Sequence, residues 1–143
     1  MSPEINLSLT FGAILSALAA AAHICVIIGG APLYRFFGAG EQFALASEKG
    51  KIYPALITFG IVVVLAAWAA YALSGAGWLT GLPFLKATLC LITGVYLLRG
   101  MAGFAMLAVK SPYSNSFIVV SSLICLGFGL VHLQGLMQVW DKL

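Results

Sequence analysis

Hydrophobic residues fall into four long runs separated by short polar segments. The runs cover approximately Leu9–Gly30, Tyr53–Leu73, Phe84–Ala108 and Phe117–Val139. An α-helix needs about 20 apolar residues to cross the hydrocarbon core of a bilayer, whereas a transmembrane strand needs only about 10. Runs of this length predict an all-α fold with four membrane-spanning helices, in a single integral membrane domain that comprises residues 1–143.

Glycine, proline and serine mark the connections between the runs. Ser74–Pro83 and Ser111–Ser116 are short and rich in turn-forming residues, so each predicts a turn between antiparallel helices. The arrangement expected is therefore an up-down bundle. The first pair of helices shows no correspondence with the second, which disfavours a transporter built from inverted repeats.

The connection between the first two helices differs from the others, because at about 22 residues it is longer than a tight turn requires. Its aromatic and aliphatic residues alternate with charged and polar ones, which predicts a short amphipathic segment in the membrane interface. The apolar members are Phe36, Phe37, Phe43 and Leu45, and the polar members are Arg35, Glu41, Gln42, Glu48 and Lys49. A linker resting on the lipid headgroups is the alternative.

Composition supports a lipid environment. Apolar residues form 62% of the chain and charged residues only 8%, and the net charge of +3 is not gathered into a basic cluster. This excludes a soluble domain and argues against nucleic-acid binding. Basic residues favour the cytoplasmic side of a membrane, and more of them lie in the first and third connections than at the other ends of the helices. We therefore expect both termini on the periplasmic side. The two groups are Arg35, Lys49, Lys51 and Lys110 against Lys86 and Lys142.

Several polar residues lie within the runs and share helix faces with small residues. We expect five of them inside the bundle: His23, Lys86, Thr93, Ser121 and His132. Helices in lipid associate through small residues and interhelical hydrogen bonds, so such stripes favour packing, with a ligand pocket or conduction path as the alternative. Small residues in the first run also suit contacts in a homo-oligomer or a larger membrane complex.

The sequence predicts no metal or cofactor site and no catalytic group. His23 and His132 are expected to differ in depth by about 13 Å, which argues against shared haem ligation. The three cysteines, Cys25, Cys90 and Cys125, are isolated and expected to be buried and inert. The four acids, Glu4, Glu41, Glu48 and Asp141, lie near or outside the membrane faces, which disfavours a Ser-His-acid catalytic site.

Arg99 is the most informative single residue. It lies near the middle of the third run, where an uncompensated charge costs about 2.5 to 3.5 kcal/mol. Glu41 or Glu48 could fold inward from the first connection to pair with it, and Tyr96 is three residues away on the same flank. Two interpretations stay open: a structural ion pair, or a site for an anion or a lipid headgroup.

Three stretches, Tyr53–Gly60, Tyr71–Gly77 and Tyr96–Gly100, resemble a family of small, uncharacterised four-span proteins of bacterial inner membranes. The resemblance implies an all-helical fold and an inner-membrane location, and it brings no activity or cofactor.

Together, these patterns favour a non-enzymatic membrane protein, either an accessory or assembly subunit or a binder of a lipid or small amphiphile. A small oligomeric channel or transporter is the alternative, and a membrane redox protein using haem or a quinone comes third.

Overall fold

The computed structural model describes residues 4–108 and 115–143. Within them the elements are α1 (Leu7–Gly29), α2 (Ala31–Phe36), α3 (Glu41–Glu48), α4 (Tyr53–Gly75), α5 (Leu85–Met106), α6 (Asn115–Val139) and the short 3-10 helix η1 (Trp140–Lys142). The helices α1, α4, α5 and α6 are long and apolar enough to cross a membrane. The chain is therefore a multi-pass membrane protein with an all-helical four-helix bundle, as the four runs predict.

Local sequence signals set the helix ends. The side chain of Asn6 accepts a hydrogen bond from the Leu9 amide at 2.8 Å and so caps the start of α1. Gly30 ends that helix with a φ of +63°, and α2 then begins at once with Pro32 in its first turn. Pro54 occupies the same favourable position in α4. Each spanning helix begins and ends within about three residues of the predicted boundary.

The first connection contains two short helices instead of one interfacial segment. Their arrangement is fixed by a small apolar cluster of Val26, Ala31, Tyr34 and Ala44. The buried Tyr34 also bonds through its hydroxyl to Thr58 Oγ1 on α4 at 3.2 Å. Phe36 remains 78% exposed, so an aromatic ring is left to the membrane interface. The connection is thus an ordered unit attached to α1 and α4.

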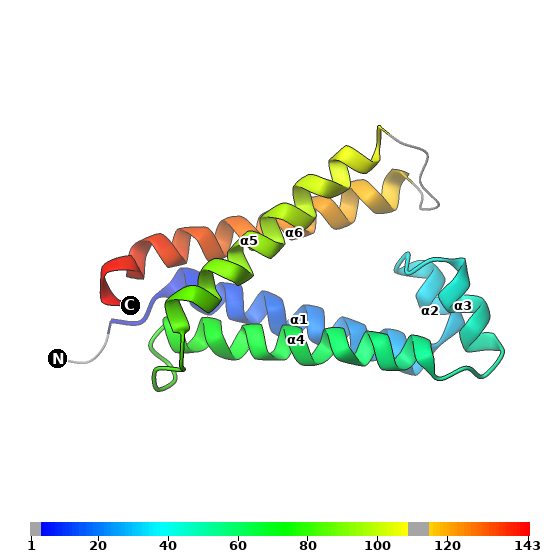
Figure 1. Cartoon of the computed structure of the whole chain (residues 1–143), viewed down its shortest axis with the longest axis horizontal. Helices are drawn as coiled ribbons and strands as arrows, with labels where there is room; N and C mark the ends of the chain where they lie inside the picture. The colour runs from blue at the N-terminus through cyan, green and yellow to red at the C-terminus, as the bar shows by residue number, and fades with distance from the viewer. Residues whose placement is uncertain (1–3, 109–114) are drawn as a thin grey trace.

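The four spanning helices form two hairpins that meet at one end and diverge toward the other. Figure 1 shows α1 lying along α4, and α5 lying along α6. The hairpins are close where both termini lie, and they separate toward α2 and α3. The turn between α4 and α5 holds these two helices together only at the end of the bundle where the termini lie. They are therefore in contact over a shorter length than the short turn suggests.

Hydrogen bonds between the helices concentrate at the end where the hairpins meet. Asn6 Nδ2 donates to Gln138 Oε1 at 2.8 Å, and the Asn6 amide donates to the Ala76 carbonyl at 3.0 Å. Trp78 Nε1 donates to Thr10 Oγ1 at 3.0 Å. We call these five residues the terminal clasp, which joins α1, α6 and the connection between α4 and α5.

Within the second hairpin, glycines let the helix backbones approach closely. A methyl group at Gly100 would lie 2.9 Å from the backbone nitrogen of Leu126, and one at Gly129 would lie 3.0 Å from that of Leu97. Such contacts are how helices associate in lipid, where burial of apolar surface gives little net attraction. The small residues of α5 and α6 therefore hold this hairpin together, in agreement with the predicted packing role.

Candidate functional site

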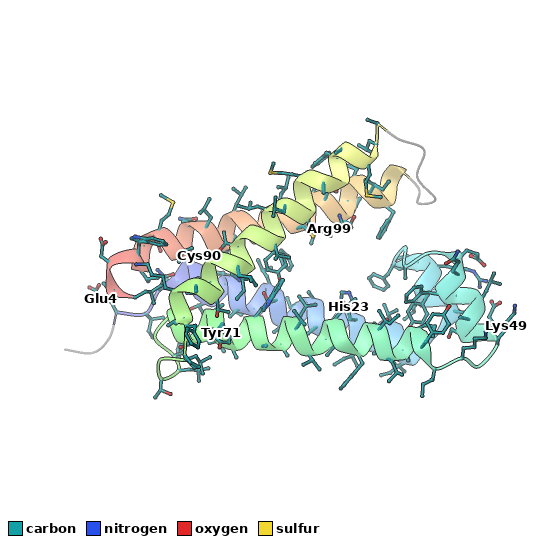
Figure 2. All side chains as sticks on the ribbon, viewed as in Figure 1. Glu4, His23, Lys49, Tyr71, Cys90 and Arg99 are labelled. Carbon is teal, nitrogen blue, oxygen red and sulfur yellow. The ribbon has the colours of Figure 1, made fainter. Side chains whose placement is uncertain are left out.

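Arg99 lies in the part of α5 that has diverged from α1 and α4. It is about two turns before the end of the helix, or roughly 10 Å along its axis. Its side chain is exposed. In Figure 2, Arg99 on α5 and His23 on α1 lie on opposite sides of the region where the two hairpins separate. The guanidinium thus lies at membrane depth and is only partly enclosed by protein.

A pocket of about 230 Å³ adjoins this arginine. Its lining residues come from three parts of the chain: Gly38 after α2, Arg99 and Met106 on α5, and Phe117 and Ile118 on α6. Apart from the guanidinium, the side chains in the lining are hydrocarbon, aromatic or thioether groups. The pocket therefore combines one positive charge with apolar walls.

Gly38 brings the first connection into contact with the second hairpin. Its φ is +67°, a conformation that favours glycine, and the ring of Phe117 lies directly against its α-carbon. A side chain at this position would collide with the ring. The pocket thus depends on a glycine that combines a left-handed backbone with a close approach.

The predicted partners of Arg99 bind another arginine, so that interpretation needs correction. Arg35 Nη2 lies 2.7 Å from Glu41 Oε1, and Arg35 Nη1 lies 2.6 Å from Glu48 Oε1. Both acids belong to α3, which packs beside α2. They form ion pairs with the nearby Arg35 and therefore do not extend to Arg99 on α5. All four carboxylates of the sequence lie in the described residues. None of them forms an ion pair with Arg99 there.

The Arg35 network lies outside the spanning segments and is exposed to solvent. Hydrogen bonding from Arg35 lowers the pKa of the Glu41 carboxyl below its usual value. Exposed ion pairs contribute little to overall stability. The network therefore serves mainly to orient α2 against α3, which places Gly38 at the pocket.

Tyr96 faces the centre of the bundle and does not contribute to the pocket lining. Its hydroxyl and that of Ser16 on α1 lie 2.9 Å apart and share a hydrogen bond. Its ring contacts Trp68 on α4 and both Phe128 and His132 on α6, with centroid distances of 5.1, 5.4 and 5.3 Å. One side chain therefore touches all the other spanning helices, and its role is to join the two hairpins.

The two histidines occupy different environments. Each ring bonds through Nδ1 to a carbonyl of its own helix, His23 to Ala19 at 2.7 Å and His132 to Phe128 at 2.8 Å. His132 is fully buried against Gly12, and its Nε2 has no partner in the described part of the chain. His23 is half-buried. Among residues 4–108 and 115–143, no group of three or more potential metal ligands (His, Cys, Asp or Glu) occurs.

The remaining polar residues expected inside the bundle are placed unevenly. Thr93 is buried and donates to its own helix at the Leu89 carbonyl, 2.8 Å away. Ser121 is half-buried and donates to the Ile118 carbonyl at 3.2 Å. Lys86 lies at the helix end, not inside, because its long side chain reaches the Trp140 carbonyl and ring. These side chains do not meet one another in a common site.

Cys25 and Cys90 are exposed, which corrects the expectation that they are buried. Their faces of α1 and α5 have no helix packed on them, and a thiol is apolar enough to face lipid. Cys125 is half-buried.

The sequence pattern missed Ser122. It is fully buried on α6, and its hydroxyl oxygen has no hydrogen-bond partner in the described residues. Adjacent serines differ by about 100° around a helix, so only one of Ser121 and Ser122 can face the neighbouring helix. The stripe with Cys125 and Gly129 favoured Ser121, whereas the structure turns Ser122 toward α5.

No protein-family model, curated protein or solved structure matches this chain. The resemblance to small four-span bacterial proteins therefore stays a prediction.

Proposed function

We propose that this protein binds an anionic lipid or a similar amphiphile, with the charged headgroup at Arg99. The observation that carries the proposal is an exposed guanidinium at membrane depth, in a pocket with apolar walls and without a carboxylate partner in the described residues. An accessory role in a membrane complex is compatible with the same site.

The electrostatic argument rests on where the acids are. A cation about 10 Å inside the end of a spanning helix is costly unless an anion or water compensates it. Glu41 and Glu48 bind Arg35, and Glu4 binds Lys142 at 3.4 Å. Asp141 lies in η1, at the other end of the bundle. The nearest available anions in a bilayer are the headgroups of its lipids, so these are the natural partners of Arg99.

The pocket also suits an amphiphile by its shape. Its volume of about 230 Å³ accommodates a headgroup, but it is small for a whole lipid. Met106, Phe117 and Ile118 provide apolar surface for the first part of an acyl chain. The rest of the acyl chain would extend from the pocket into the surrounding bilayer.

The test compares lipid binding by two charge-removing variants. Purified wild type, Arg99→Gln and Lys49→Gln are placed in mild detergent with dioleoyl phosphatidylglycerol or dioleoyl phosphatidylcholine and examined by native mass spectrometry. Lys49 is exposed at the end of α3, away from the pocket lining, so its variant controls for overall charge.

The wild type and Lys49→Gln are expected to retain phosphatidylglycerol, and Arg99→Gln to retain about tenfold less, since a charged hydrogen bond contributes about 1.5 to 3 kcal/mol. Equal retention by all three proteins would overturn the proposal. A solute flux in liposomes that Arg99→Ala abolishes would favour a transporter instead.

The location proposed is a bacterial inner membrane, with both termini periplasmic. The support is the excess of basic residues in the connections on the α2 and α3 side. A cysteine at Lys49 should then react with an impermeant maleimide only after the cells are opened, whereas a cysteine at Trp78 should react in intact cells. The reverse pattern contradicts this orientation.

A further inference from the structure

Ser122 and Arg99 converge on one spot above the backbone of Gly103. A methyl group added to Gly103 would overlap the Ser122 hydroxyl and would lie 3.1 Å from Arg99 Nη1. The two polar side chains, one from each helix of the second hairpin, are therefore neighbours. Ser122 Oγ nevertheless has no hydrogen bond to Arg99 or to any other described residue.

This unpaired hydroxyl is unusual among the polar residues of the spans. Thr58 and Thr93 both donate to the carbonyl four residues earlier in their own helices, each at 2.8 Å. Ser121, beside Ser122, donates to the Ile118 carbonyl. A buried polar group without a partner costs about 1 to 3 kcal/mol, so such a group points to an absent partner.

Ser122 is one helical turn from Ile118, which lines the pocket beside Arg99. Arg99 Nη1 lies close to the Ser122 hydroxyl above Gly103, so an outward turn of the exposed Arg99 side chain would open this buried hydroxyl to the same pocket. The absence of a side chain at Gly103 leaves the space that the Ser122 hydroxyl occupies beside Arg99 Nη1.

We infer that Ser122 is the second contact for the headgroup and that the ligand is a phosphate-bearing amphiphile. The inference rests on the proposed function and narrows its ligand class. A carboxylate is planar and uses both oxygens in a two-point pairing with a guanidinium. A phosphate is tetrahedral and offers further oxygens, so it can pair with Arg99 and accept a hydrogen bond from Ser122 on another helix.

The experiment compares Ser122→Ala with its neighbour Ser121→Ala. The probes are dioleoyl phosphatidate, with a phosphate headgroup and two acyl chains, and oleate, with a carboxylate headgroup and one chain, together with inorganic phosphate, which lacks the chains. Binding is measured by native mass spectrometry and by titration in detergent, and thermal stability is recorded without added ligand.

Ser122→Ala is expected to weaken phosphatidate binding by about tenfold and to leave oleate binding unchanged, because only the phosphate reaches the hydroxyl. Ser121→Ala should change neither. The stability of Ser122→Ala without ligand should be equal to or above that of the wild type, because the variant loses an unpaired polar group. Binding of inorganic phosphate as tight as that of phosphatidate would assign the site to the free anion.

The inference is overturned if Ser122→Ala weakens phosphatidate and oleate equally, or if neither changes. In both cases Arg99→Gln tests the proposed function separately. If this variant loses phosphatidate binding, Arg99 still forms a headgroup site, but Ser122 does not belong to it. If Arg99→Gln retains wild-type binding, the headgroup site itself is lost.

Discussion

At the scale of single residues, the bundle depends on glycines that meet specific side chains. A methyl group at Gly12 would lie 2.8 Å from His132 Cε1 and 3.0 Å from its Nε2. The ring is fully buried and cannot move aside without shifting α6. Gly12 is therefore the position at which α1 accommodates the only buried imidazole in the described residues.

Replacing Gly12 with alanine should destabilise the protein by about 1 to 3 kcal/mol, since it overpacks this contact. Gly60→Ala is the matched control, because this glycine also lies within a spanning helix and has nothing within 4 Å of its added methyl group. Thermal unfolding in detergent is the measurement. Gly60→Ala should be neutral or slightly stabilising, and an equal loss in both variants would show that the His132 contact is not responsible.

The sequence predicts the depth of Arg99 but not its partners. Its depth follows from the length of an apolar run, which a single chain displays directly. Its pairing depends on whether Glu41 and Glu48 find a nearer cation, and Arg35 lies six and thirteen residues from them. Short loops bring such pairs together at little entropic cost, so the local pair is favoured over a distant one.

At the scale of the elements, α2 and α3 form a unit that reaches the second hairpin through Gly38. Gly50 shares the same φ of +67° but has nothing within 4 Å of an added methyl group. The two glycines thus separate the cost of the backbone conformation from the cost of the contact with Phe117.

Gly50→Ala is expected to cost about 1 kcal/mol, the penalty of a left-handed backbone for alanine. Gly38→Ala should cost more, because the Phe117 ring must also move. It should in addition weaken phosphatidylglycerol binding, since the ring lines the pocket. Thermal unfolding and native mass spectrometry report the two effects, and identical behaviour of the variants argues against a contact between Gly38 and Phe117.

The packing of α3 on α2 should depend on pH through Glu41. Because Arg35 lowers the pKa of this carboxyl in the folded protein, the pair is fully stabilising above the ordinary pKa of 4.5 and weakens as the pH falls through the lower folded value. Amide exchange in residues 31–48, corrected for the intrinsic effect of pH, should therefore become faster in acid.

In the Arg35→Gln variant, the amides of residues 31–48 should exchange fast already at neutral pH, and their exchange should no longer depend on the protonation of Glu41. Unchanged exchange of the wild type between neutral and acid conditions contradicts the assigned role of the pair.

The sequence also predicts where the elements lie more completely than how they pair. Apolar runs and turn residues give the spans, since helix length and turn chemistry are local properties. The amphipathic pattern of the first connection predicts helix there, yet Gly38 and Gly40, both with positive φ, divide it into two helices. The choice of Ser122 over Ser121 depends on a rotation about the α6 axis that only its neighbours determine.

At the scale of the whole molecule, the polar contacts of the two ends are unequal. The terminal clasp of Asn6, Thr10, Ala76, Trp78 and Gln138 joins the hairpins at one end. At the other end, Gly38 makes an apolar contact with the ring of Phe117 on α6. The hairpins should accordingly be held more firmly near the termini.

Spin labels test this difference through the widths of distance distributions. A pair at Leu7 and Met137, near the clasp, should give a narrow distribution, and a pair at Ile57 and Met101 a broad one. All four side chains are exposed, so the labels disturb little packing. The Asn6→Ala variant should broaden the first pair, because it removes the hydrogen bonds of the side chain. Equal widths in the wild type would contradict the asymmetry.

The contacts of Tyr96 with α1, α4 and α6 lie between the two hairpins and form the point about which one hairpin would rotate relative to the other. Tyr96 lies 10 residues before the end of α5, or about 15 Å along its axis, so a rotation of about 11° at Tyr96 displaces that end by about 3 Å. That displacement is close to the length of one hydrogen bond. A ligand that binds or leaves at the diverging ends of the hairpins would therefore change the surface that the protein presents to its neighbours in the bilayer.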